Sequence, residues 1–156
     1  MIYLAINQSP YTIDYAVFDY MSKELLQYGT AYYKEKDNTS RIIEIWESIE
    51  ELLDDIKPNI VLTQLLDLRY TMKRELEQIM QMRTIIRKLC YDKNIMYNEF
   101  RTVGWEKRIT DLKKPSRIAK LKIAKEYSNM IDREEVADAI ILAEGVVWNR
   151  LQIGRD

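Results

Sequence analysis

Residues 2–10 read IYLAINQSP, an apolar run that leads into a polar segment ending in Ser-Pro. A second apolar, β-branched and aromatic run, IDYAVFD, follows at residues 13–19. Two such runs on either side of a Ser-Pro turn predict a β-hairpin. A third strand is expected at about residues 24–34, so the chain should open with three antiparallel strands.

Helical and strand patterns alternate over the rest of the chain. The expected elements are a helix at about 40–56, a strand at 59–63, a helix at about 68–92, a strand at 95–100, and helices at about 115–129 and 133–150. Residues 38–40, Asn-Thr-Ser, are expected to cap the first helix, and Pro58 to close it. The continuous apolar run at 59–63 is typical of a strand in the middle of a sheet. This order predicts an α/β fold with a mixed sheet flanked by helices.

The composition bounds the class of protein. At 156 residues, 47% hydrophobic and 31% charged, the chain has the size and balance of a single globular domain over residues 1–156. No apolar run approaches the roughly 18 residues that a membrane helix needs. The N-terminus has no export-signal pattern, so a cytoplasmic location without membrane association is expected.

The cysteine and histidine counts exclude several chemistries. There is no histidine and only one cysteine, Cys90. Disulfides, zinc sites built from Cys and His, and Ser-His or Cys-His catalysis are therefore excluded. An enzyme with this sequence must rely on carboxylates, lysines, tyrosines or hydroxyls.

A basic stretch lies between Trp105 and Lys125, with eight basic residues against two acidic ones. Its basic residues are Lys107, Arg108, Lys113, Lys114, Arg117, Lys120, Lys122 and Lys125. A local basic face is what phosphate binding needs, because neutralised phosphates release their counterions. A charged run is more often only a solvated face, so this stretch alone does not decide the function.

Two acidic residues stand near the start of the last predicted helix. Glu135 and Asp138 lie three residues apart and hence on one face of the helix. Ala137 and Ala139 are small enough to let that helix pack close to a sheet. Because Asp138 is embedded in an apolar run, its carboxylate needs a compensating partner or a metal ion.

Three of these features together resemble the RuvC-type Holliday junction resolvases of the RNase H-like superfamily. They are an apolar first strand that ends at a metal-binding turn, a site position at the end of strand 59–63, and a last helix that opens with acid-x-x-Asp. The resemblance covers essentially the whole chain through its element order. It implies an RNase H-like α/β fold with a mixed five-stranded sheet flanked by helices. It also implies a metal-dependent, structure-selective endonuclease that cleaves Holliday junctions and other branched DNA by phosphodiester hydrolysis.

The resemblance further implies a metal site of four acidic side chains that hold two Mg²⁺ ions, for which Mn²⁺ can substitute. In this chain the first ligand position falls on Asn7 and the second on Thr63. The last pair falls on Glu135 and Asp138. Asn7 and Thr63 both lack the expected charge, so the second ligand is missing, relaxed to a hydroxyl, or supplied by Asp67.

Asn7 leaves two alternatives open. It is nearly isosteric with aspartate, and Asn7→Asp would complete the motif. The chain is then either an inactivated variant that still binds its substrate or a natural sequence. The simpler interpretation is that Asn7 begins the Asn-Gln-Ser-Pro turn, a position that asparagine fills well.

The basic stretch acquires a specific role from the same resemblance. A lysine on the helix before the acidic one would approach the scissile phosphate, and Lys114 and Lys120 are both candidates. Trp105 and Tyr70 could stack on an unpaired base, although such aromatics more often pack in or beside the core. The expected DNA-binding residues are Lys107, Arg108, Lys113, Lys114, Arg117, Lys120, Tyr70 and Trp105.

The resemblance also implies a homodimer, because a symmetric protein suits a two-fold junction. The apolar seam from Leu68 to Leu89 is expected either to form that interface or to pack on the sheet. The composition, rich in Ile, Lys, Tyr and Asn, and the short divergent form are similar to RuvC-like endonucleases of lactococcal phages. That similarity implies the cytoplasm of a bacterial host.

Two other functions compete with the resolvase. One is an RNA-processing nuclease of the same fold, and the other is a non-catalytic branched-DNA-binding protein that has lost the metal site. A purely helical interaction module is the weakest alternative, because it ignores the strand patterns at 2–7, 13–19 and 59–63.

Overall fold

The structure of the protein is a computed structural model in which residues 1–9, 11–34, 37–65, 73–101 and 116–147 are described. Three strands open the chain, β1 (Ile2–Gln8), β2 (Thr12–Asp19) and β3 (Leu25–Tyr32). They pair antiparallel in sequence order, as the hairpin pattern predicts. Their bounds agree with the expected strands to within two residues.

Two further strands complete a mixed sheet. β4 (Ile60–Leu65) pairs parallel with β1, and β5 (Met96–Arg101) pairs parallel with β4. The sheet order is β3-β2-β1-β4-β5, so β1 lies at its centre. The predicted α/β fold with a mixed five-stranded sheet is confirmed.

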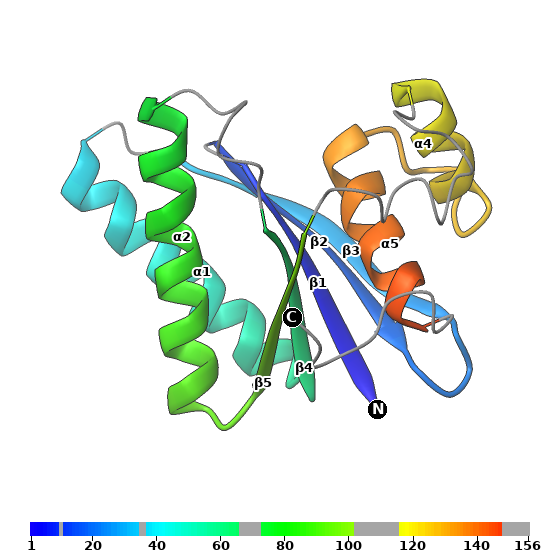
Figure 1. Ribbon diagram of the computed structural model, residues 1–156, viewed down its shortest axis with the longest axis horizontal. Helices are drawn as coiled ribbons and strands as arrows, with labels where there is room; N and C mark the ends of the chain where they lie inside the picture. The colour runs from blue at the N-terminus through cyan, green and yellow to red at the C-terminus, as the bar shows by residue number, and fades with distance from the viewer. Residues whose placement is uncertain (10, 35–36, 66–72, 102–115, 148–156) are drawn as a thin grey trace.

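Helices cover both faces of the sheet (Figure 1). α1 (Asn38–Ile56) and α2 (Lys73–Asp92) pack on one face. On the other face lies α5 (Glu134–Val147), with α4 (Arg117–Lys125) beside it. No helix among the described residues is long and apolar enough to cross a membrane.

The side-chain alternation of β1 assigns each of its residues to one layer. Tyr3 and Ala5 pack in the core under α5, whereas Leu4 and Ile6 pack in the core under α1 and α2. Successive residues of a strand point to opposite faces, so a shift of one position exchanges the layers.

The ends of α1 explain its boundaries. Asp37 caps the helix, because its carboxylate accepts a hydrogen bond of 2.9 Å from the Ser40 amide. That bond lowers the pKa of Asp37. The expected cap, residues 38–40, is therefore wrong by one position, since Asn38 already begins the helix. At the other end Lys57 adopts a left-handed conformation (φ 50°) and donates its amide to Leu53, just before Pro58.

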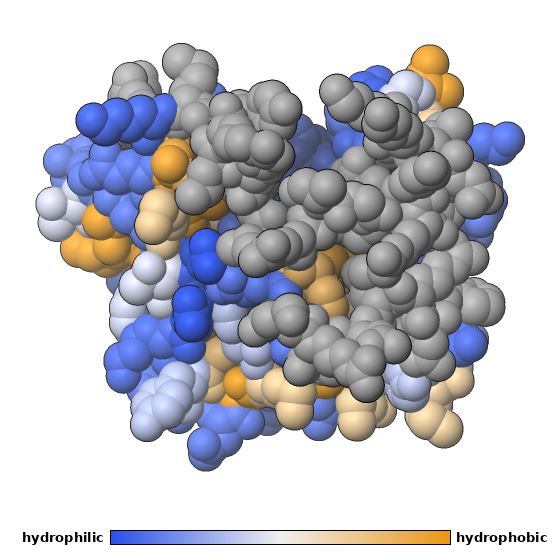
Figure 2. All heavy atoms as spheres, viewed as in Figure 1, coloured by the Kyte–Doolittle hydropathy of each residue, from blue (hydrophilic) through white to orange (hydrophobic). Residues whose placement is uncertain are grey.

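The apolar seam of α2 packs inside the chain. Ile79, Met82, Ile86 and Leu89 are buried in the core under α1 and α2. Burying a side chain of this size stabilises a fold by roughly 1.5–3 kcal/mol. In its described part, the seam therefore packs on the sheet and is not available as a dimer interface. On the face that Figure 2 shows, the described surface over α1 and α2 is mostly hydrophilic, with separate apolar spots.

Candidate functional site

Asn7 is the next-to-last residue of β1, and it lies within the strand. Its Cα partner on β2 is Asp14, so the interpretation of Asn7 as the start of a turn is wrong. By the alternation of β1, Asn7 lies on the same face as Tyr3 and Ala5, the face that α5 covers. Its amide is half-buried.

Asp14 lies directly across from Asn7 and is fully buried, with 0% of its surface exposed. Three donors surround its carboxylate. Thr12 Oγ1 donates to Oδ2 at 2.6 Å, and Thr30 Oγ1 donates to Oδ1 at 2.6 Å. Arg133 Nε donates to Oδ1 at 3.1 Å. A buried carboxylate needs such hydrogen bonds and a counter-charge, and Asp14 has both.

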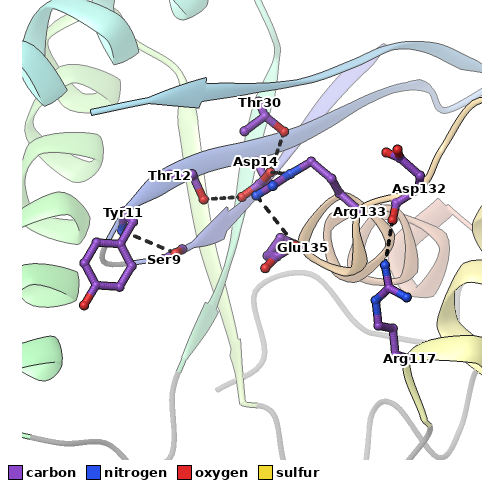
Figure 3. A network of polar contacts seen from close by, with 9 residues as sticks. All are labelled: Ser9, Tyr11, Thr12, Asp14, Thr30, Arg117, Asp132, Arg133 and Glu135. Carbon is purple, nitrogen blue, oxygen red and sulfur yellow. Dashed lines mark hydrogen bonds and ion pairs between the residues drawn. The ribbon is translucent and has the colours of Figure 1, made fainter. Parts of the chain in front are cut away.

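Arg133 precedes the first residue of α5 and joins the helix to the sheet (Figure 3). Its Nη2 lies 3.6 Å from Oε2 of Glu135, and its guanidinium carbon lies 5.3 Å from the ring centroid of Tyr32. Burial works against its charge, but the hydrogen bond to Asp14 and the charges of Asp14 and Glu135 outweigh that effect. The pKa of Arg133 is therefore raised above its ordinary value.

Lys120 reaches the acidic end of α5 from α4. Its Nζ lies 2.9 Å from Oδ1 of Asp138 and 3.2 Å from Oε1 of Glu134. The Lys120 side chain is only 12% exposed. Ser116 caps α4 through a bond of 3.2 Å from the Ala119 amide, which fixes the start of the helix that carries Lys120. Of the two lysine candidates, Lys120 is thus beside the predicted carboxylate, and Lys114 lies outside the described residues.

Thr63 lies on the opposite face of the sheet. Its hydroxyl is buried and lies 2.8 Å from the Tyr97 hydroxyl, which donates to Oε1 of Glu99 at 2.7 Å. Arg83 of α2 donates Nε to the same oxygen at 2.8 Å. Burial, with Glu99 adding to it, raises the pKa of Tyr97 despite the Thr63 hydrogen bond. The structure therefore does not bring Thr63 to the face of Asn7, and its hydroxyl serves a polar chain under α2.

Gln64 takes the place on the site face that the resemblance assigned to Thr63. Its Cα partner on β5 is Phe100, whose side chain packs in the core under α5. In the parallel pair of β1 and β4, Thr63 faces Ile6, so the next residues, Gln64 and Asn7, share a face. Both sheet positions of the candidate site thus carry amides.

The remaining predicted residues fall into two groups. Arg117 is exposed at the start of α4, where its Nη2 donates to the Asp132 carbonyl at 3.1 Å. Asp67, Tyr70, Trp105, Lys107, Arg108, Lys113 and Lys114 lie outside the described residues. Within the described ranges, no group of three or more acidic, Cys or His side chains is close enough together to hold a metal ion.

No family model matches the sequence, and no curated protein matches it. Solved structures do match. The chain superposes on Thermus thermophilus RuvC with a TM-score of 0.78 and 11% identity, over 96% of both chains. RuvC from the same organism in complex with a Holliday junction substrate gives 0.77 and 14% identity, over 96% of this chain and 95% of that one. The fold is that of the RuvC resolvases.

A third structure extends the RuvC similarity to a eukaryotic organelle. The yeast mitochondrial Holliday junction resolvase matches with a TM-score of 0.69 and 12% identity, over 93% of this chain and 77% of that one. The RuvC resemblance seen in the sequence is therefore confirmed at the level of the fold.

Sequence reasoning missed two members of this site. Asp14 sits in an apolar strand pattern, where it reads only as one polar position of the hairpin. Arg133 precedes Glu135 by two residues and reads as surface charge. The available signal was the alternation of β2, which puts Asp14 on the same face as Ala16 and Phe18 and so inside the core. An acid in a core position demands a partner, and the sequence does not say which one.

Proposed function

We propose that this protein is a structure-selective endonuclease that cleaves Holliday junctions and other branched DNA by metal-dependent phosphodiester hydrolysis. The supporting observation is the RuvC fold over nearly the whole chain, with Glu135 and Asp138 in the first turns of α5 and Lys120 beside Asp138. One of the matching RuvC structures holds a Holliday junction substrate. A homodimer, which would set two sites on a two-fold junction, belongs to the same proposal.

The charges of the donor side chains determine how many metal ions the site can hold. Asn7 and Gln64 are neutral, so two of the positions that would hold a pair of ions lack charge. Mg²⁺ is often bound by only one or two carboxylates, with water and substrate phosphate completing its shell. We therefore propose one Mg²⁺, replaceable by Mn²⁺, held by Glu135 and Asp138 with the Asn7 amide oxygen as a further donor. Bound there, the ion would supply Lewis-acid activation of the phosphodiester.

The protein's own side chains have complementary tasks in this proposal. Lys120, 12% exposed and 2.9 Å from Asp138, holds that carboxylate in place. Its ammonium group also offers a positive charge to a phosphate that approaches the start of α5. On the outer side of α4, the exposed Arg117, Lys122 and Lys125 provide sequence-independent contacts to the DNA backbone.

The decisive experiment is cleavage of an end-labelled four-way DNA junction in Mg²⁺, compared with EDTA. The linear duplex of the same sequence and a structured RNA serve as alternative substrates. We expect paired cuts near the crossover that disappear in EDTA and in Asp138→Asn. Junction binding should survive in Asp138→Asn, because Asn preserves the shape of the side chain. Preferred cutting of the RNA would favour an RNA-processing nuclease.

A second candidate is a branched-DNA-binding protein of the same fold without catalysis. The observation that favours it is the pair of amides, Asn7 and Gln64, at the sheet positions of the site. This candidate predicts selective junction binding and no cuts, either by the unchanged chain or after Asn7→Asp. Cuts that appear only with Asn7→Asp would instead identify the chain as an inactivated nuclease.

A further inference from the structure

Arg133 carries an inference that deepens the proposed function and rests on it. We propose that Arg133 binds a backbone phosphate of the DNA beside the candidate site, and that Asp14 is the positioning residue that holds it there. Asp14 is buried, it holds the guanidinium of Arg133, and Arg133 lies at the start of α5.

The first observation is that Asp14 is committed to holding Arg133. The carboxylate is fully buried, and its two oxygens accept hydrogen bonds from Thr12, Thr30 and Arg133. Nothing of it remains exposed to bind a ligand directly. Replacing a buried ion pair by apolar residues of similar volume often leaves the stability of a protein unchanged. The core therefore does not need the Asp14 carboxylate for its own stability. The position of Arg133 is what this arrangement secures.

The second observation concerns how Arg133 is held. Its Nε edge is bonded to Asp14, and its guanidinium carbon lies 5.3 Å from the ring centroid of Tyr32. Of its terminal nitrogens, Nη2 makes a longer ion pair of 3.6 Å with Oε2 of Glu135. Arg133 is 31% exposed, so this end of the side chain reaches the surface. A fixed, planar donor fork is suited to phosphate, since little side-chain entropy is lost on binding.

The third observation is the location. Arg133 immediately precedes α5, whose first turn carries Glu134 and Glu135 and whose next turn carries Asp138. Asp14, its partner, is the Cα partner of Asn7. Arg133 therefore contacts both the strand residue paired with Asn7 and Glu135 in the first turn of α5 (Figure 3). A DNA strand that enters this site passes the guanidinium.

The test is the salt dependence of DNA binding, measured by fluorescence anisotropy in EDTA on a four-way junction and on a linear duplex. We expect Arg133→Gln to weaken binding about tenfold and to reduce the slope of log K against log salt by about 0.9, as for one lost phosphate contact. Arg133→Lys should keep the slope and lose part of the affinity. Arg87→Gln is the matched control, because it removes an arginine that is 60% exposed on α2, across the sheet. It should leave both quantities unchanged.

The double variant Asp14→Asn/Arg133→Gln guards against a folding defect, because it removes the buried charge together with its partner. It should fold and show the same loss of slope as Arg133→Gln. An unchanged slope in both variants would overturn the inference and leave Arg133 as a counter-charge only. Equal affinity of the unchanged chain for junction and duplex would overturn the proposed function, while the variants could still be compared on the duplex. Failure of the unchanged chain to bind either DNA would overturn both.

Discussion

Asn7→Asp is the substitution that would restore the charge expected at the end of β1, and the structure predicts that it will destabilise the protein. The new carboxylate would face Asp14, its Cα partner on the antiparallel strand. Directly opposed side chains have Cβ atoms about 4.5–5.5 Å apart, and like charges at such positions repel. At about 5 Å and an effective dielectric constant of about 20, two unit charges interact by roughly 3 kcal/mol.

Arg133 attracts both carboxylates and offsets part of this repulsion. We therefore expect Asn7→Asp to lower the free energy of unfolding by roughly 1–3 kcal/mol at pH 8 in EDTA. Repulsion raises the folded-state pKa of the new carboxyl above its unfolded value of about 3.9, so its protonated form is favoured. The loss is therefore absent below about pH 4 and grows as the pH rises through the raised pKa. Mg²⁺ bound by the new carboxylate together with Glu135 and Asp138 should reduce this loss.

The assay is urea unfolding at pH 4.5 and pH 8 of the unchanged protein, Asn7→Asp, Asp14→Asn and the combined variant Asn7→Asp/Asp14→Asn. Asp14→Asn alone is expected to be destabilised, since Arg133 loses its partner. In the Asp14→Asn variant, however, adding Asn7→Asp should be neutral or stabilising, because the new carboxylate replaces Asp14 as the partner of Arg133. Equal losses from Asn7→Asp in both backgrounds would refute the argument, since the two side chains would then be uncoupled.

Three further predictions address other parts of the fold. Tyr97→Phe removes the hydroxyl between Thr63 and Glu99, and should lower the free energy of unfolding in urea by about 1–3 kcal/mol. Junction binding should be unchanged, because these hydrogen bonds lie under α2, on the other face of the sheet. Weakened binding by a folded variant would show that the two faces are coupled. Ser116 caps α4, so Ser116→Ala should lower the free energy of unfolding in urea by about 1 kcal/mol, and Ser116→Asn by much less. Equal losses in the two variants would mean that the cap is not the cause. Burial raises the pKa of Cys90 from 9.0 to about 12, so the thiol should resist alkylation at pH 8 until urea unfolds the chain. Because the pKa is raised in the folded state, the protonated Cys90 thiol contributes fully to stability below pH 9, and this contribution is lost as the pH rises toward 12. Cys90→Ala should not show this loss.

The fold was largely predictable because its signals are local. Alternating and continuous apolar runs identified the five strands, and helical spacing identified α1 and α2. Errors of a residue arose where a cap decides the boundary, as at Asp37, since Asp, Asn and Ser compete for that role in one short segment. The seam of α2 had two compatible partners in the sequence, and burial of Met82 and Leu89 under the sheet decided between them.

The candidate site was predictable only in part. Asp138 stood out because it lies in an apolar run, whereas Glu135 and the two lysine candidates, Lys114 and Lys120, came from the resemblance to the resolvases. Thr63 was assigned by similarity of sequence, but a strand exchanges its faces with every residue, so an uncertainty of one position put it in the wrong layer. No local sequence pattern indicates the contact between Asp14 and Arg133, because only the tertiary fold brings these two segments together.

That contact spans 119 residues of sequence and links β2 to the residue that precedes α5. Contacts between residues so far apart in sequence form more slowly than local ones, so we expect α5 to dock after the sheet has formed. Until then Asp14 has no cation and the sheet face under α5 is open to water. The acids of α5 and the strand end that carries Asn7 come together in the same step that covers this face. A partly folded molecule therefore has no assembled site, and any DNA cleavage would be confined to chains that have finished folding.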